Sequence, residues 1–152
     1  MTPYVVGQTL PKLVKPPITK TQLVKYSGAS GDFNPIHTVE EFAVSAGLGG
    51  VIAHGMLTMA FVGQMMTDTI GLTGPLQQFS VRFQEMVRPG DVVTCEGKII
   101  QVEEAHGEQI VYCEIWAMTA PERVVVAGKA TFSVPLESNA VQGESNPVQN
   151  ER

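Results

Sequence analysis

Residues 55–70 constrain the fold of this chain more than any other segment. Most of its positions are apolar: Met56, Leu57, Met59, Ala60, Phe61, Val62, Met65 and Met66. A helix that is apolar on almost all sides has to be surrounded by the rest of the protein. Gly71 and the Gly74-Pro75 pair then stop it. The sequence therefore predicts a buried central helix over residues 55–70.

After this helix the hydrophobic period changes to two. Phe79, Val81 and Phe83 alternate with polar residues, which is typical of a strand with one buried face. Further strands are expected over residues 92–102, 110–118 and 123–134, with polar turns between them. Strands so close together in sequence favour an antiparallel meander. One apolar helix and one long antiparallel sheet predict an α+β domain in which the sheet wraps the helix.

Two short helices are expected before the central one. A capping-box pattern at residues 19–22 predicts the start of the first, which Gly28 and Gly31 end. A second capping box at residues 38–41 predicts another, with these side chains facing inward: Val39, Phe42, Ala43 and Ala46. We expect one domain over residues 1–136. Residues 137–152 are polar and aperiodic, which is typical of a disordered tail.

The composition narrows the function classes. Charged residues make up 16% of the 152 residues, against about 25% in an average domain, which suggests that a partner chain covers part of the surface. The net charge of −5 argues against nucleic-acid binding. No segment is long and apolar enough for a membrane span, and the N-terminus lacks a signal-peptide pattern. We therefore expect a soluble cytoplasmic protein, in which Cys95 and Cys113 are reduced and form no metal site.

Residues 32–37 carry the strongest functional signal. Asp32 and His37 are five positions apart, and Pro35 between them stiffens the turn and disfavours a helix at the preceding residue. His54 and Gly55 follow at the start of the apolar helix. An acid and a base beside a backbone donor are the groups needed to add or remove water next to a carbonyl, which indicates an enzyme. The alternative is that Asp32 only caps the turn and His37 is a polar residue at a helix start.

The combination of D-x-N-P-x-H with a downstream H-G-M resembles the MaoC-like dehydratases, which include the (R)-specific enoyl-CoA hydratases, or hydratase 2. The resemblance rests on residues 26–37, 53–57, 81–83 and 88–91, and it covers most of residues 5–135. It is closest to the B-type subunits of (3R)-hydroxyacyl-ACP dehydratase. It implies a hot-dog fold with an overhanging segment above the pocket. It also implies a homodimer, or a heterodimer with another hot-dog subunit, with edge-to-edge sheets and sites between the subunits.

The resemblance also implies a reaction, the (R)-specific hydration of trans-2-enoyl thioesters or its reverse, with CoA or acyl carrier protein as the carrier. His37 would activate the water, Asp32 would be its acid partner, and the backbone N–H of Gly55 would bind the substrate oxygen. Neither a cofactor nor a metal ion is expected. A hot-dog thioesterase, and an acyl-binding subunit of a heterodimer, are the alternative functions.

Three further residues are candidates for substrate binding. Asn34 is either a turn-forming residue or a substrate contact. His54 either braces the loop before the helix or reaches the substrate. Gly63 either allows close contact between elements or leaves space beside an acyl tunnel. His106, in a polar turn, is expected to be a solvated surface residue.

Overall fold

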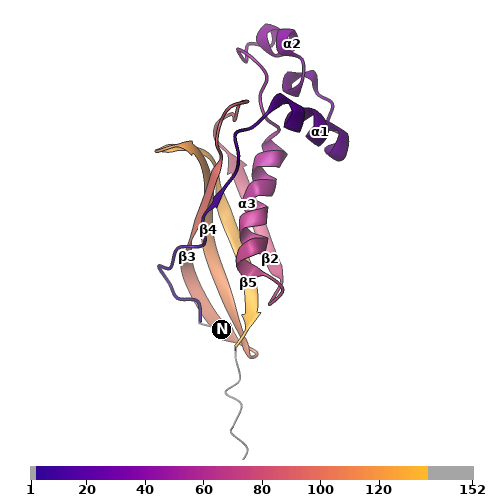
Figure 1. Cartoon of the computed structure of the whole chain (residues 1–152). Helices are drawn as coiled ribbons and strands as arrows, with labels where there is room; N and C mark the ends of the chain where they lie inside the picture. The colour runs from indigo at the N-terminus through magenta and orange to yellow at the C-terminus, as the bar shows by residue number, and fades with distance from the viewer. Residues whose placement is uncertain (1–2, 137–152) are drawn as a thin grey trace, which may run out of the picture.

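A curled antiparallel sheet wraps one long helix in the computed structural model, which describes residues 3–136 (Figure 1). The tail predicted at residues 137–152 lies outside the described residues. The strands are β1 (Leu13–Val14), β2 (Leu76–Phe83), β3 (Thr94–Ala105), β4 (Glu108–Ala120) and β5 (Arg123–Pro135). The helices are α1 (Lys20–Ser30), α2 (Glu40–Ser45) and α3 (Gly55–Ile70), with a single 3-10 turn at Pro35–His37. The predicted α+β hot-dog architecture is confirmed.

The strand order of the sheet is β1-β3-β4-β5-β2, and all pairs are antiparallel. Strands β3, β4 and β5 form the expected meander, but the prediction was wrong for β2. This strand pairs with β5, with Phe79 opposite Ala130, and not with β3, which follows it in sequence. The chain between β2 and β3 therefore crosses the sheet, and β2 becomes an edge strand. Among residues 3–136, no strand pairs with its outer side.

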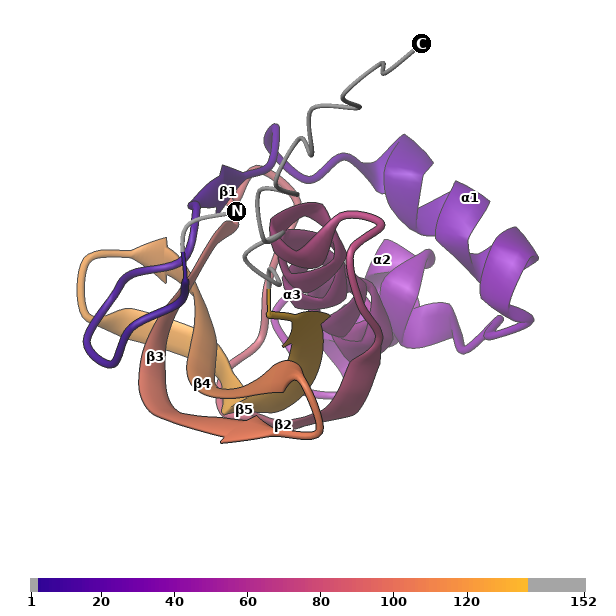
Figure 2. The ribbon, with the colours of Figure 1, turned by 90° about the horizontal axis from the view of Figure 1, so that it is seen from below.

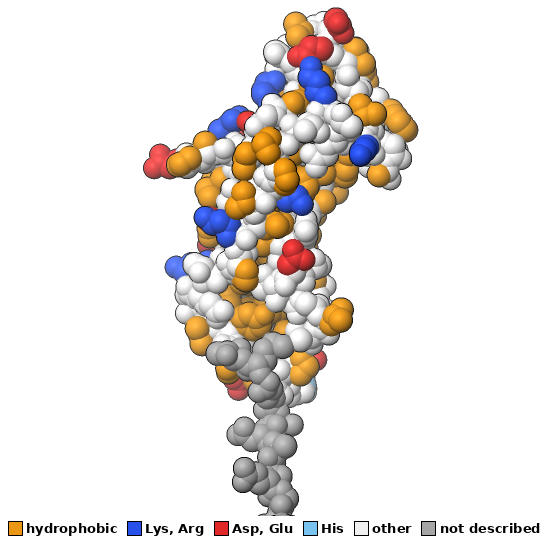
Figure 3. All heavy atoms as spheres, viewed as in Figure 1, with side chains coloured by type: hydrophobic (Ala, Val, Ile, Leu, Met, Phe, Trp, Pro, Cys, Tyr) orange, Lys and Arg blue, Asp and Glu red, His pale blue; other side chains and the backbone are white. Residues whose placement is uncertain are grey.

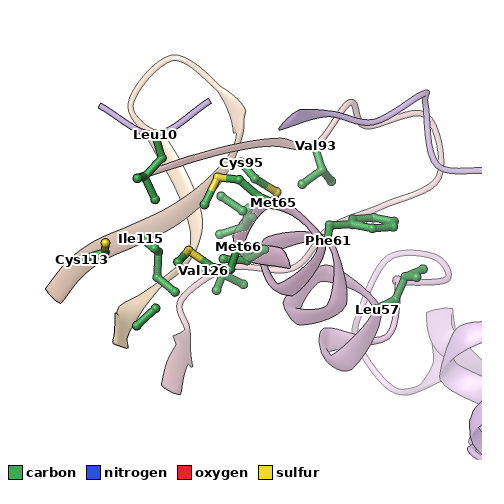
Figure 4. Close-up of a cluster of buried hydrophobic side chains, with 14 of the residues drawn as sticks. Leu10, Leu57, Phe61, Met65, Met66, Val93, Cys95, Cys113, Ile115 and Val126 are labelled. Carbon is green, nitrogen blue, oxygen red and sulfur yellow. The ribbon is translucent and has the colours of Figure 1, made fainter. Parts of the chain in front are cut away.

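Helix α3 begins and ends at the predicted residues. Its last turn is closed by a hydrogen bond from the Gly71 N–H to the backbone oxygen of Thr67. One side of the helix lies in the hollow of the sheet, while α1 lies on the opposite side (Figure 2). Met65 and Met66 extend from α3 toward strand residues such as Cys95 and Val126 (Figure 4). The predicted central helix is confirmed, but it is not buried nearly all round, because the sheet curls round only part of it. Met56, for example, is 56% exposed.

The segment between β1 and α3 forms the overhang, which lies beyond the end of the sheet and above the start of α3 (Figure 1). Thr19 caps α1 as predicted, accepting a hydrogen bond from the Gln22 N–H. The second capping box was wrong. Thr38 instead ends the 3-10 turn by donating its N–H to Pro35, so Val39 becomes the N-cap of α2 without a side-chain bond.

The inward face predicted for α2 was also largely wrong. Ala43 is buried, but three apolar residues expected beside it are exposed: Val39, Phe42 and Ala46. Acidic and basic side chains are scattered over the face of the molecule drawn in Figure 3. Within the described residues, no helix has the length and apolar character needed to span a membrane.

Candidate active site

The turn between α1 and α2 is built by its own side chains. Gly31 ends α1 in the left-handed region at φ 75°, which favours glycine. The Asp32 carboxylate then accepts the N–H of Asn34 at 3.1 Å, and the Asn34 side chain accepts the N–H of Ile36 at 3.2 Å. In each of these two turns a side-chain oxygen accepts the backbone N–H two residues further on, and together they lead into the 3-10 turn that starts at Pro35. Local sequence therefore brings Asp32 and His37 to the same side of the segment.

The carboxylate of Asp32 faces the imidazole of His37. The distance from Asp32 Oδ2 to His37 Nε2 is 3.8 Å, which is too long for a direct hydrogen bond. A water about 2.8 Å from each atom would fit, with an angle of about 85° between its two contacts. The His37 side chain is 9% exposed and the Asp32 side chain 51%, so a buried imidazole faces a carboxylate that is open to solvent.

A backbone carbonyl sets the tautomer of His37. Its Nδ1 lies 2.8 Å from the carbonyl oxygen of Ile52, in the loop just before α3. Because a carbonyl can only accept, Nδ1 has to carry the proton. The lone pair of a neutral His37 ring is then on Nε2, which points at Asp32. A neutral His37 can therefore accept a proton on the side of the ring that faces Asp32.

His54 lies flat against His37. The two ring centroids are 3.8 Å apart, with 24° between the ring planes. Its Nε2 lies 3.2 Å from Ser27 Oγ and 3.3 Å from the backbone oxygen of Asp32, and Tyr26 also contacts its ring. Burial lowers the pKa of His54, and the neighbouring His37 lowers it further, whereas the bond to Asp32 acts in the opposite direction. His54 is therefore a buried ring that favours the neutral form.

The start of α3 offers free backbone donors. His54 is the N-cap residue, yet its side chain makes no capping bond, because it is directed at Asp32 and Ser27 instead. Within residues 3–136, the Gly55 N–H donates no hydrogen bond. A first-turn amide of this kind carries positive partial charge and is suited to an oxygen that develops negative charge.

Glycine at position 55 keeps that amide accessible beside an aromatic ring. A Cβ at residue 55 would lie 3.2–3.4 Å from the ring of Phe83, which is the last residue of β2 and is 48% exposed. Phe83 also lines a cavity of about 470 Å³ together with Met86, Arg88 and other residues. Phe83 is thus the aromatic neighbour of Gly55, although Gly55 itself does not line this cavity.

Asp32, His37 and His54 bring three possible metal-binding atoms within 4.8 Å of one another. However, the stacked rings direct their in-plane lone pairs side by side and not toward one point. The arrangement therefore suits acid–base chemistry better than chelation.

Comparison with known proteins identifies the family of this chain. A family model described as "MaoC like domain" matches residues 4–120. The chain belongs to the MaoC-like domain family. Over 119 residues this MaoC-like chain is 29% identical to an (R)-specific enoyl-CoA hydratase of Rhodospirillum rubrum, covering 78% of the chain and 81% of the hydratase. The crystal structure titled as the (R)-hydratase from A. caviae involved in PHA biosynthesis matches with a TM-score of 0.77 and 26% identity, over 87% and 98% of the two chains.

A fatty acid synthase subunit beta of Aspergillus oryzae is 35% identical over 128 residues, which are 82% of the MaoC-like chain but 6% of that subunit. The chain thus spans only a small part of the synthase subunits that it matches. A relative of similar length is the 3-hydroxybutyryl-CoA dehydratase of Methylorubrum extorquens, which is 27% identical over 86% of this chain and 82% of that protein.

The structure brings together some of the predicted site residues of this MaoC-like domain. Asp32, His37 and His54 converge, whereas the Asn34 side chain is engaged in its own turn. Gly63 lies two turns along α3 from Gly55, and a Cβ there would contact Phe79 of β2 at 3.6 Å.

Sequence reasoning assigned no role to several residues that build the site. Tyr26, Ser27 and Phe83 are within the motifs that carried the resemblance, so a signal was present for them. The carbonyl of Ile52 had no such signal, because every residue has a carbonyl and only the fold decides where it points.

Proposed function

We propose that the protein catalyses the (R)-specific hydration of trans-2-enoyl thioesters and the reverse dehydration of (3R)-hydroxyacyl thioesters, with CoA or acyl carrier protein as the carrier. The observation that supports this most is the pairing of His37 Nε2 with Asp32 Oδ2 at 3.8 Å, together with the fixed proton on His37 Nδ1. The space between the two atoms matches a water that hydrogen-bonds to both, placed between a base and a carboxyl group.

The residues divide the reaction between them. In hydration, His37 Nε2 takes a proton from the bridging water while the water oxygen bonds to C3 of the enoyl group. Asp32, as the acid partner, supplies the proton that C2 gains. Transfer of the proton from His37 to Asp32 then restores both groups, so the net change is the addition of one water. In dehydration each step runs backward, with the roles of acid and base exchanged.

The Gly55 N–H is the proposed donor to the thioester oxygen. As water adds at C3, negative charge moves to this oxygen, and the first turn of α3 offers a free amide with positive partial charge. Losing a donor of this kind typically costs about 3–4 kcal/mol of transition-state stabilisation. A Gly55→Ala change keeps the amide and adds a methyl group beside Phe83, so it tests access and not the donor itself.

The acyl chain is proposed to lie along the seam between α3 and β2. Two glycines of α3, Gly55 and Gly63, face two phenylalanines of β2, Phe83 and Phe79. A Cβ at either glycine would already lie 3.2–3.8 Å from a ring, so an acyl chain enters this seam only when the two rings turn aside. Because a Cβ at Gly63 meets Phe79 at 3.6 Å, an ordinary contact, Gly63→Ala should fold normally but reduce kcat/KM for long acyl chains more than for short ones. Equal changes for both lengths would contradict the placement of the chain.

A second hot-dog subunit is proposed to complete the site. The outer side of β2 is unpaired among residues 3–136, and apolar side chains near the site are exposed, with Phe33 at 71% and Met56 at 56%. An open strand edge next to exposed apolar residues favours edge-to-edge pairing of sheets. Light scattering of the purified protein should give the mass of a dimer. A monomer with full activity would contradict this part of the proposal.

The test of the reaction is a spectrophotometric assay of the purified protein on short and long trans-2-enoyl-CoA, followed by chiral analysis of the product. We expect loss of the enoyl absorbance, formation of the (R)-3-hydroxyacyl thioester and no release of free thiol. Free thiol without hydration would identify a thioesterase, and an (S)-product would contradict the assigned stereochemistry. If activity appears only with a second hot-dog subunit, the active form is a heterodimer.

A further inference from the structure

The proposed chemistry uses only one of the two stacked imidazoles. His54 is 1% exposed, and its ring lies 3.8 Å from that of His37 with a tilt of only 24°. A buried titratable ring in contact with the proposed base affects that base in one of two ways: a charge on the ring changes the pKa of the base, or the ring fixes its orientation. The hydrogen bonds around His54 distinguish these two effects.

Those bonds place the proton of His54 on Nε2. This atom lies 3.3 Å from the backbone oxygen of Asp32, which can only accept, and 3.2 Å from the Ser27 hydroxyl, which can accept as well. The other nitrogen, Nδ1, is buried and has no hydrogen-bond partner within the described part of the chain. His54 is therefore the Nε2–H tautomer, whereas His37 is the Nδ1–H tautomer because of its bond to Ile52.

We propose that His54 is a positioning residue that holds the two ends of the Asp32–His37 pair at their working distance and stays uncharged while His37 gains and loses its proton. The face of the His54 ring fixes the plane of His37. Its N–H fixes the backbone of Asp32. One rigid ring thus connects to both partners of the acid–base pair, and the pair itself has no direct hydrogen bond.

The surroundings of His54 explain why it stays neutral. The titratable groups that face it are His37, Asp32 and Tyr26. Burial is the largest effect on the pKa of His54 and lowers it, and a positive His37 at stacking distance lowers it again. A second cation in this stack would also lack any acceptor at Nδ1. The proton taken from water therefore does not pass to His54, and it stays on His37 until its transfer to Asp32.

The first test is independent of activity and uses the fact that the chain has three histidines. Long-range ¹H–¹⁵N correlation spectra of the ¹⁵N-labelled protein distinguish the two neutral tautomers. His106→Asn and His37→Gln identify two of the three spin systems, so His54 follows by subtraction. We expect His54 to give the Nε2–H pattern and to keep it from pH 8 down to about pH 6.5, where an unperturbed imidazole is half protonated. An Nδ1–H pattern, or a charged His54 ring in this range, would overturn the proposal.

The second test separates the two contacts of His54, and it rests on the proposed hydratase function. His54→Phe keeps an aromatic face against His37 but loses the N–H, whereas His54→Gln keeps an N–H donor but loses the ring. Small displacements of reacting groups have large effects, so we expect each variant to lower kcat about 10- to 100-fold with KM within about twofold of wild type. The control is His106→Asn, in an exposed turn at φ 53°, which asparagine tolerates.

The outcomes of the two tests distinguish this inference from the function on which it rests. If the wild type hydrates enoyl thioesters and both folded His54 variants match its kcat, the positioning role is wrong and the hydratase proposal stands. If the wild type shows no activity, the proposed function fails and the tautomer spectra alone decide the state of His54. If neither His54 variant folds, the wild-type spectra again decide.

Discussion

Replacing Asp32 by asparagine removes a charge and a proton-transfer group while leaving the turn intact. The Asn34 N–H is bonded to the Oδ1 of Asp32 at 3.1 Å, and an asparagine side chain provides the same acceptor. The side chain is 51% exposed, so we expect the free energy of unfolding to change by no more than about 0.5 kcal/mol. Any large loss of activity would then come from chemistry and not from unfolding.

The size of that loss follows from the distance to His37. Opposite unit charges 3.8 Å apart attract by about 1 kcal/mol at the dielectric constant of water and about 4 kcal/mol at an effective constant near 20. Asparagine gives up this stabilisation of a protonated His37 and the proton transfer as well, which is typically worth about 10²- to 10⁴-fold. We therefore expect kcat for a trans-2-enoyl-CoA to fall at least about 100-fold, with little change in KM.

The assay measures initial rates on enoyl-CoA for wild type, Asp32→Asn and a matched control. The control is Asp91→Asn, because Asp91 also accepts a backbone N–H three residues away, that of Arg88 at 2.8 Å, but takes no part in the proposed pair. Both variants should unfold at urea concentrations close to wild type. A folded Asp32→Asn enzyme that keeps more than about a third of the wild-type kcat would refute the role of this carboxyl group.

Three further predictions concern stability and buried groups. Met66→Ala should lower the free energy of unfolding by about 2–5 kcal/mol in urea titrations because Met66 is fully buried against the sheet, whereas Leu72→Ala, at an exposed residue, should change it by less than about 0.5 kcal/mol. Burial raises the thiol pKa of Cys95 and Cys113 to about 12, so neither should react with a disulfide reagent at pH 8 until denaturant is added, and rapid labelling of the native protein would contradict their burial. Because the pKa of His54 is lowered in the folded state, the unfolded chain binds a proton that the folded chain does not, and the free energy of unfolding should fall as the pH drops below about 6.5. His54→Phe should lose this part of the pH dependence, and an unchanged pH dependence would show that His54 is not its source.

Features that depend on local sequence were predictable. The bounds of α3 follow from its apolar run, with Gly55 at its start and Gly71 at its end. The turn at residues 32–37 follows from Asn34 and Pro35, whose preferences act within a few residues. The motif also indicated that Asp32 and His37 act together, because this turn places both side chains on the same side of the segment.

Features that depend on long-range contacts were not predictable in the same way. The pairing of β2 with β5 joins segments about 50 residues apart, and the alternation of side chains is the same whichever neighbour a strand takes. The stacking of His37 on His54, and the bond from His37 to the Ile52 carbonyl, arise only when the overhang folds onto the start of α3.

The exposed side of α2 has a different cause. A capping box and an apolar periodicity predict that Phe42 and Val39 face inward, but among residues 3–136 these side chains stay 46% and 43% exposed. The apolar periodicity of a helix indicates which side chains are expected to be covered. It does not specify whether the same chain or another chain covers them.

The central claim is that Asp32 and His37 act on one shared water as a single unit. Its most direct test is a double-mutant cycle with Asp32→Asn, His37→Gln and the double variant, in which kcat for enoyl-CoA hydration is measured for all four proteins. Groups that work as a unit are strongly non-additive, so each single change should cost nearly as much as both together. If the two losses multiply, the residues act independently, and the shared-water account of this site is wrong.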